Sequence, residues 1–269
     1  MHWIIQDNLF NEENHLVLLE TLKRFEIPHT IVKVLPMSSH LPLNERVIPF
    51  VNPSGLVMVC GSVSLSKMGT DLSWYPGSFL NDNHDYRIWK EHYGNHLLNY
   101  DAVVSTFENV EHKWDEFFIR PCEDTKTFSG QVMDWEEFAD WRRRVLDLNE
   151  TYTTLDRNTV VMYSPIKQIY REARFFIIDG KIATCSTYKI GNMVKGISEV
   201  PPTMIDFTNR MLDIWVPARA FVIDIALTDD EDDGYCKIIE INCINCSGYY
   251  AIDVQKFVIA IENMEFNDE

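Results

Sequence analysis

The sequence has no apolar run close to the roughly 20 residues that a helix needs to cross a bilayer. It also lacks a Walker-type phosphate loop, a Gly-x-Ser-x-Gly nucleophile turn and a His-Glu-x-x-His zinc motif. Positive charge is scarce, because 24 Lys and Arg are set against 41 Asp and Glu, for a net charge of −17. We therefore expect no membrane partner and no broad nucleic-acid interface, although this charge does not argue against a local basic pocket for a nucleotide.

The six cysteines show no spacing typical of a disulfide framework. The one close pair, Cys243 and Cys246, has no second Cys or His pair that would complete a zinc site. Buried free thiols in a reducing compartment are the simpler interpretation. The amino terminus has no basic flank before its apolar residues, which is not typical of a secretory signal. These features predict a cytoplasmic protein, in the host cytoplasm if the gene belongs to a phage, and leave its oligomeric state open.

The first 108 residues alternate between strand and helix patterns. Apolar residues at helical spacing indicate a helix over 11–25, and a second helix is expected over 85–100. Short apolar runs predict three strands, at 3–5, 30–34 and 57–60. This βαβ rhythm is typical of a small α/β domain, which we place at residues 1–108.

Residues 109–269 instead show hairpin patterns, which are typical of an α+β region. Asp179-Gly180 between two apolar runs is a strong hairpin signal. A second hairpin is expected across the acidic run 229–233, which we interpret as a solvated turn. The pattern predicts strands at 116–120, 159–163, 174–178, 181–188, 221–227 and 236–241, and helices at 135–146, 203–214 and 252–264.

The second hairpin carries three side chains with oxygen donors. Glu240 and Asn242 are two residues apart and therefore project from the same face of their strand. If the hairpin pairs symmetrically about the acidic run, Asp224 lies opposite them on that face. Two carboxylates and one amide oxygen on rigid strands suit Mg²⁺. The alternative is that these residues form a solvent-facing side of the sheet, and the pattern alone does not decide between the two.

An Asp on one strand followed by Glu-x-Asn on the next resembles the ATP-grasp superfamily. Three further segments resemble it in the expected order along the chain: FIRPCEDTKTFSG, VVMYSPI and REARFFIIDGKIATCSTYK. They look like the phosphate-covering loop, the hinge strand beside adenine and the strands that line the nucleotide. Lys189 stands where the superfamily usually has arginine. Together with CGS at 60–62, PGSF at 76–79 and LLN at 97–99, it resembles a clade found in bacteria and phages.

This resemblance implies a substrate-selecting α/β domain at 1–108, similar to the family's pre-ATP-grasp domain. An ATP-grasp fold with antiparallel sheets would follow at 109–269. The implied activity is that of an ADP-forming ligase that uses ATP and Mg²⁺ to convert a carboxylate into an acyl phosphate, which an amine or a thiol then attacks. Its partners would be small-molecule or peptide carboxylates and amines, in a peptide-forming or protein-modifying reaction. A kinase that stops after phosphoryl transfer and a non-catalytic nucleotide-binding protein are the alternatives.

The resemblance also implies roles for individual cations. Arg120 and Lys126 flank the loop that would close over the triphosphate, where their charges would neutralise phosphate oxygens. Lys189 would contact the transferred phosphoryl group. The alternative for Arg120 is an ordinary ion pair at the surface.

Four residues are expected around the nucleoside. Glu172 would accept hydrogen bonds from the ribose hydroxyls, and Arg174 shares its face of the strand. Pro165 has no amide hydrogen, so adenine would meet the Ile166 amide and the Ser164 carbonyl. Ser164 stands where the family usually has a glutamate.

In related ligases the segment after Glu-x-Asn contacts the acceptor substrate, and here that segment is CINCSGYY. Its Asn245, Ser247 and Gly248 offer an amide, a hydroxyl and close approach of the backbone. We add Ser62 from the N-terminal region as a fourth predicted substrate residue. The alternative for CINCSGYY is a turn before the last helix.

Overall fold

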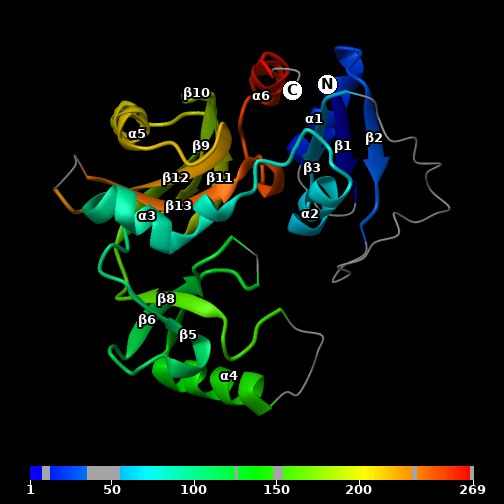
Figure 1. Cartoon of the computed structure of the whole chain (residues 1–269). Helices are drawn as coiled ribbons and strands as arrows, with labels where there is room; N and C mark the ends of the chain where they lie inside the picture. The colour runs from blue at the N-terminus through cyan, green and yellow to red at the C-terminus, as the bar shows by residue number, and fades with distance from the viewer. Residues whose placement is uncertain (8–12, 35–54, 125–126, 148–153, 232–234, 267–269) are drawn as a thin grey trace.

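The computed structural model describes residues 1–7, 13–34, 55–124, 127–147, 154–231 and 235–266 of the chain. They form three β-sheets with helices packed against them (Figure 1). One sheet lies in the N-terminal part, and the other two lie one above the other in the larger part of the molecule. The predicted fold class is confirmed, because a parallel N-terminal sheet is followed by two antiparallel ones.

The N-terminal sheet is parallel and has the strand order β2-β1-β3-β4. Its elements are β1 (His2–Gln6), α1 (Glu13–Arg24), β2 (His29–Val32), β3 (Val57–Cys60), α2 (Val63–Asp71) and β4 (Pro76–Gly77). Side chains of the central strand alternate between two cores. Ile4 packs with Leu65 of α2, whereas Trp3 packs with α1 and with the C-terminal helix α6 (Val254–Glu262). Helices therefore cover both faces, as a parallel sheet requires.

The five-stranded sheet is antiparallel and has the order β11-β10-β9-β12-β13. Its strands are β9 (Ile169–Ile178), β10 (Lys181–Ile190), β11 (Met193–Ile197), β12 (Ala220–Thr228) and β13 (Cys236–Cys243). Both predicted hairpins are confirmed: Asp179 and Gly180 turn with φ of 47° and 71°, and β12 pairs with β13. One face packs against α3 (Tyr86–Tyr93) and α5 (Pro202–Ile214) through an apolar core.

The four-stranded sheet is antiparallel and has the order β5-β8-β6-β7. Its elements are β5 (Val103–Thr106), β6 (Glu116–Pro121), β7 (Gln131–Asp134), α4 (Trp135–Asp147) and β8 (Val160–Ser164). Edge-to-face ring contacts between Phe107, Phe117 and Phe138 join α4 to the sheet. β5 precedes residue 108 and yet pairs with β8. The domain boundary at 108 stays a prediction, and it would cut the chain just after the first strand of this sheet.

Some elements differ from the expectations. α3 is shorter than the predicted helix 85–100, because Gly94 takes a positive φ of 52° and a short 3-10 turn follows. The strand expected at 174–178 begins at Ile169. The sequence does not predict the edge strands β7 and β11, whose mostly exposed side chains lack apolar alternation. None of the described helices is long and apolar enough to cross a membrane.

Candidate functional site

One face of the five-stranded sheet changes from apolar to polar along its strands. On β9, Phe176 and Ile178 belong to the core that includes α6. Glu172 and Arg174 continue the same face toward the other end of the strand, because strand side chains alternate with a period of two. The candidate site lies on this polar half.

Arg174, Asp224 and Glu240 form a row across β9, β12 and β13. Asp224 is the direct cross-strand partner of the other two, as the symmetric hairpin predicts. Arg174 donates from Nε to Oδ1 of Asp224 at 2.8 Å and from Nη2 to Oδ2 at 2.7 Å. Both side chains are buried. Burial raises the pKa of Asp224 to about 6, although Arg174 acts in the opposite direction. Burial also disfavours the Arg174 cation, but the Asp224 charge raises the Arg174 pKa above its ordinary value.

Glu240 lies between two arginines. Arg120 donates from Nη1 to Oε2 of Glu240 at 2.5 Å, and Nη2 of Arg174 is 3.7 Å from Oε1. The Arg120 side chain is only 9% exposed, and its guanidinium lies 5.3 Å from the centroid of the Trp89 ring. Arg120 therefore forms its ion pair inside the molecule and not at the surface. The pair also joins β6 of one antiparallel sheet to β13 of the other.

Glu172 receives two hydrogen bonds from β10. Lys189 Nζ donates to Oε1 at 2.6 Å, and the Tyr188 hydroxyl donates to Oε2 at 2.7 Å. Two successive residues reach one carboxylate because the register of β10 against β9 shifts between Thr187 and Lys189. Sequence reasoning missed Tyr188, since strict alternation places it on the face opposite Lys189.

A second tyrosine that the sequence analysis missed lies beside Arg174. The rings of Tyr188 and Tyr250 stack at 4.7 Å with an interplanar angle of 13°, and the Arg174 guanidinium is 4.8 Å from the Tyr250 centroid. Arg174 also donates from Nη1 to the Gly248 carbonyl at 3.2 Å. The Tyr-Tyr pair at 249–250 is visible in the sequence, but nothing in the sequence connects it to Arg174.

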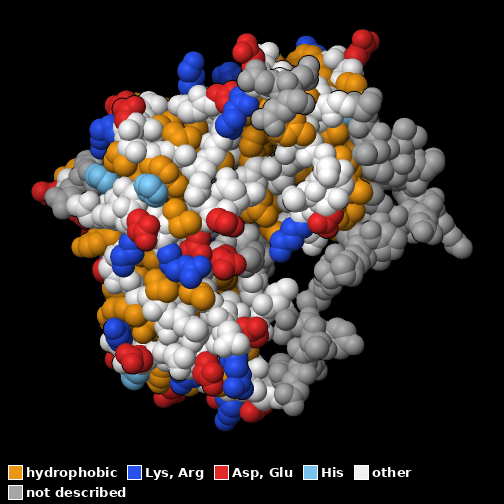
Figure 2. Space-filling model, viewed as in Figure 1, with side chains coloured by type: hydrophobic (Ala, Val, Ile, Leu, Met, Phe, Trp, Pro, Cys, Tyr) orange, Lys and Arg blue, Asp and Glu red, His pale blue; other side chains and the backbone are white. Residues whose placement is uncertain are grey.

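A cleft of about 600 Å³ lies between the two antiparallel sheets. Its charged lining residues come from three strands of one sheet and one of the other: Arg120, Glu172, Lys189 and Glu240. Its apolar lining includes Leu98, Phe118, Val132, Ile166 and Ile169. Figure 2 shows side chains of both charges gathered where the upper and lower parts of the molecule meet. The volume and the mixed lining are typical of a site for an organic ligand with a charged group.

The three predicted Mg²⁺ ligands are adjacent but unequally accessible. Glu240 lines the cleft, whereas Asp224 and Asn242 are 0% and 1% exposed and do not line it. As a donor set, two carboxylates and an amide fit Mg²⁺, while Arg174 occupies both oxygens of Asp224. Among the residues that the structure describes, no group of three or more His, Cys, Asp or Glu is arranged to hold a metal.

The predicted adenine contacts lie at the end of β8. Ser164 is fully buried, and its hydroxyl donates to Oδ1 of Asn99 at 3.0 Å. Ile166 is 47% exposed and lines the cleft. Lys126 lies outside the described residues, so its role remains a prediction from the sequence.

Asn245, one of the predicted substrate residues, connects the N-terminal part to the five-stranded sheet. Its Nδ2 donates to the Val59 carbonyl at 2.7 Å and to the Gly77 carbonyl at 3.3 Å. Its Oδ1 accepts from the Phe79 amide at 2.8 Å, and its side chain is buried. The amide group is thus engaged on both its donor and its acceptor side within the protein.

The other three predicted substrate residues also make internal hydrogen bonds. Ser62 caps α2 by accepting from the Leu65 amide at 3.3 Å. The Ser247 hydroxyl donates to the Cys243 carbonyl at 2.8 Å, and Gly248 accepts from Arg174 as described above. None of the four lines the cleft between the antiparallel sheets. Their roles in substrate binding stay predictions.

Comparison with protein families gives one match. The family model for the ATP-grasp domain of the arginine-to-lysine clade, family 3, matches residues 61–261, which is well over half of the chain. No curated protein matches the chain.

Solved structures with the same fold cover almost the whole chain. A RimK-domain ATP-grasp protein from Sphaerobacter thermophilus has a TM-score of 0.59 and 8% identity, with 92% of each chain covered. The D-alanine–D-alanine ligase of Bacillus anthracis, complexed with ATP, has a TM-score of 0.58 and 12% identity, with 97% of this chain and 96% of that one covered. The ATP-grasp ligase PsnB, complexed with a variant of its minimal precursor, Mg and ADP, has a TM-score of 0.56 and 11% identity, with 96% of each chain covered. At these identities the likeness shows the fold alone.

Proposed function

The chain belongs to the ATP-grasp domain family 3 of the arginine-to-lysine clade, and from this premise we propose that it is an ATP- and Mg²⁺-dependent ligase that joins a carboxylate to an amine. The observation that carries the proposal is the mixed lining of the cleft between the antiparallel sheets. Arg120 and Lys189 supply cations beside the Glu240 carboxylate, and the remaining lining is largely apolar. A nucleoside triphosphate divides in the same way, into a flat apolar base and a charged phosphate chain.

The nucleoside would lie along the apolar lining. The Ile166 amide and the Ser164 carbonyl would meet the edge of adenine. Glu172 would accept hydrogen bonds from the ribose hydroxyls and would then exchange part of its present bonding to Lys189. Release of Lys189 from Glu172 would free the ammonium group for the phosphates.

The phosphate chain would lie beside Arg120, Lys189 and the loop that carries Lys126. These cations favour the transition state because negative charge on the transferred phosphoryl group is neutralised where it develops. Mg²⁺ would be held by Glu240, Asp224 and Asn242, and it would supply further charge neutralisation at the phosphates. Arg174 would orient Asp224 toward its neighbours on the sheet face.

The proposed reaction has two steps. An oxygen of the substrate carboxylate attacks the γ-phosphorus, the bond to the β–γ bridging oxygen breaks, and ADP leaves an acyl phosphate behind. The amine nitrogen then attacks the carbonyl carbon, phosphate leaves, and the nitrogen loses a proton. No side chain needs to act as a nucleophile, so the protein contributes position and charge.

One structural neighbour favours an amine acceptor over a thiol. It is named as a ligase of D-alanine to D-alanine, and an amino acid offers an amine to its partner's carboxylate. A kinase and a non-catalytic nucleotide-binding protein remain the second and third candidates. The proposal also includes the Mg²⁺ requirement, a bacterial or phage origin and a cytoplasmic location.

We further propose a division of labour along the chain. Residues 109–269 would hold the nucleotide and Mg²⁺, and residues 1–108 with the segment 243–250 would select the substrate. Every predicted phosphate, ribose or Mg²⁺ residue lies in the second region, which supports this division.

Product analysis tests the activity. The protein is incubated with ATP, Mg²⁺ and a small-molecule extract that supplies carboxylates and amines. ADP and phosphate in equal amounts, with a new amide found by mass spectrometry, are expected. ADP with a phosphorylated product and no free phosphate would favour the kinase. Titration with a non-hydrolysable ATP analogue, with and without Mg²⁺, tests binding separately, and Lys126→Ala is expected to lower turnover by orders of magnitude.

A further inference from the structure

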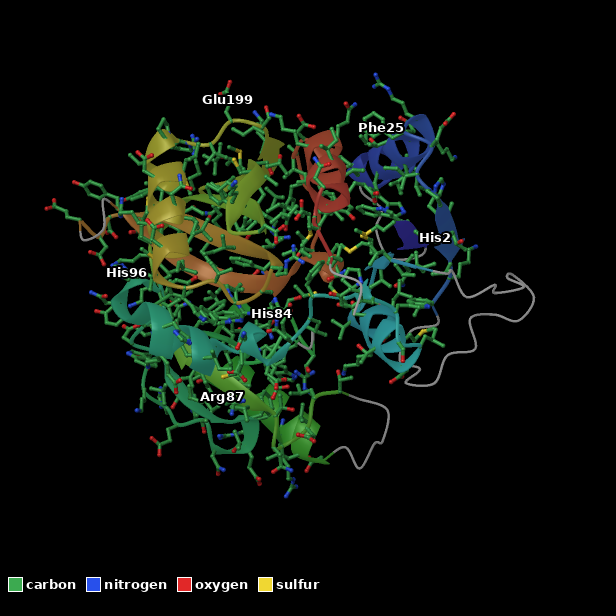
Figure 3. All side chains as sticks on the ribbon, turned by 45° about the horizontal axis from the view of Figure 1, so that its top comes forward. His2, Phe25, His84, Arg87, His96 and Glu199 are labelled. Carbon is green, nitrogen blue, oxygen red and sulfur yellow. The ribbon has the colours of Figure 1, made fainter. Side chains whose placement is uncertain are left out.

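A second groove, of about 590 Å³, opens beside the N-terminal part of the molecule. Its walls come from α2, from the segment that runs into α3, and from the residues that follow β6. His84 and Arg87, both labelled in Figure 3, belong to the segment that enters α3. None of the residues predicted to hold nucleotide or Mg²⁺ lines this groove.

The groove is continuous with the nucleotide-sized cleft. A small cavity of about 190 Å³ lies between them. It shares Arg120, Gly130 and Glu240 with the cleft, and it shares Glu123 and Asp124 with the groove. A molecule in the groove can therefore reach the residues assigned to the γ-phosphate and Mg²⁺ without passing through the nucleotide.

The inner wall of the groove is fixed to the reaction centre. The Tyr86 amide donates to the Cys122 carbonyl at 2.8 Å, which holds the start of α3 against the segment after β6. Oδ2 of Asp124 accepts from the Cys243 amide at 2.9 Å, and Cys243 directly follows the predicted ligand Asn242. The Asp124 carboxylate therefore lies where an acceptor would approach the acyl phosphate.

The charge of the groove has a definite arrangement. Arg87 is engaged by Asp85, with Nη2 2.5 Å from Oδ2, so this pair contributes little net charge. The remaining lining carboxylates are Asp82, Glu123 and Asp124, and the remaining cation is Lys67. Lys67 forms no ion pair with another residue in the part of the chain that the structure describes. It lines the groove but not the small cavity that leads inward.

We infer that this groove binds the acceptor, and that the acceptor is a free amino acid or short peptide with an aliphatic side chain. Its amino group lies toward Glu123 and Asp124, at the end nearest the reaction centre, and its carboxylate lies toward Lys67. Val63, Leu80 and Ile88 supply the apolar surface for the side chain. The volume suits a ligand of this size. The inference rests on the proposed ligase function, because only a ligase needs an amine at this position.

Direct binding of a defined probe tests the inference. Glycyl-L-leucine is titrated into the protein, saturated with a non-hydrolysable ATP analogue and Mg²⁺, and followed by isothermal titration or ligand-observed NMR. N-acetylation of the probe removes its cation, and amidation of its carboxyl end removes its anion. Each change is expected to weaken binding about tenfold, because each leaves a protein charge without its partner.

Two variants identify the end that each residue contacts. Glu123→Gln is expected to weaken the free dipeptide about tenfold and to leave the N-acetylated probe unchanged. In Lys67→Gln the free acid and the amide should bind alike. Glu20→Gln, on the exposed side of α1, removes one carboxylate far from the groove and serves as the charge-matched control.

The outcomes separate this inference from the proposed function. If the ATP analogue fails to bind to the wild-type protein, the proposed function fails. If the analogue binds but glycyl-L-leucine does not bind at millimolar concentration, the inference is overturned and the nucleotide site stands. Binding that ignores N-acetylation, or that is unchanged in both variants, also overturns it.

Discussion

Arg174 holds both carboxylate oxygens of Asp224 in a buried pair, although Asp224 is a predicted Mg²⁺ ligand. The two residues are direct neighbours across β9 and β12, so the pair is set by the register of the sheet. An isolated buried carboxylate is costly, and Arg174 offsets that cost before any metal binds. The arginine therefore has a structural role beside its proposed role in orienting the ligand.

A double-mutant cycle on this pair tests that role. Asp224→Ala or Arg174→Met alone leaves a buried charge without its partner, and each is expected to lower the free energy of unfolding by about 3–5 kcal/mol. The double variant Asp224→Leu, Arg174→Met removes both charges and is expected to cost clearly less than the sum of the two. Urea unfolding gives the free energies. Strict additivity would show that the two charges are not coupled.

Glu240→Gln is the cleaner test of the Mg²⁺ site. Glu240 is 25% exposed and lines the cleft, so its substitution disturbs folding less than that of Asp224. We expect turnover of ATP to fall about 100-fold or more, because a ligand to the metal is lost. Circular dichroism and the urea midpoint verify that the fold persists. Near-wild-type turnover in saturating Mg²⁺ would contradict the assignment of Glu240 to the metal.

Gly130 limits the shape of the nucleotide cleft. A Cβ atom added at Gly130 would lie 2.7 Å from Cζ of Phe118, which is too close, and both residues line the cleft. Gly130→Ala should therefore push the Phe118 ring into the space assigned to adenine and weaken the ATP analogue about tenfold. Gly69→Ala is the matched control, since its Cβ would meet Trp74 at an ordinary 3.4 Å. Equal affinities in the two variants would place adenine elsewhere.

Burial protects two thiols from alkylation. It raises the pKa of Cys60 and that of Cys122 to about 12. At pH 8 their thiolate fractions should be about 1,000-fold lower than in the unfolded chain, so iodoacetamide should modify them correspondingly slowly. Cys185 is partly exposed and is expected to react faster. Peptide mass spectrometry over time measures each rate, and rapid modification of Cys60 in the folded protein would contradict its burial.

The sequence predicts the parts of the site that local rules control. Alternation along a strand places Glu172 with Arg174, and hairpin symmetry places Asp224 opposite Glu240; the observed register confirms both. The register shift that brings Tyr188 and Lys189 to one carboxylate breaks the same alternation. No local pattern predicts where such a shift falls, so the sequence could not assign Tyr188.

Contacts between distant segments are the other part that the sequence does not predict. Arg120 and Glu240 are 120 positions apart, and their ion pair depends on how the two antiparallel sheets pack. The groove depends on the same packing, because α2, α3 and the segment after β6 meet only in the folded chain. Residue type suggested a role for each side chain, but only the tertiary structure shows which partners it has.

Asn245 gives a test that separates a structural role from the substrate role predicted from the sequence. Its amide bonds to Val59, Gly77 and Phe79, and it is buried. Asn245→Ala removes these bonds and leaves buried backbone groups without partners, so we expect a loss of about 2–4 kcal/mol in the free energy of unfolding. Ser247→Ala removes a single hydroxyl bond and should cost only about 1 kcal/mol. Urea unfolding of both variants is compared with their Michaelis constants for the acceptor. A wild-type stability for Asn245→Ala with a raised Michaelis constant would return Asn245 to the substrate site. A large loss of stability would instead assign it to the joint between the N-terminal sheet and β13.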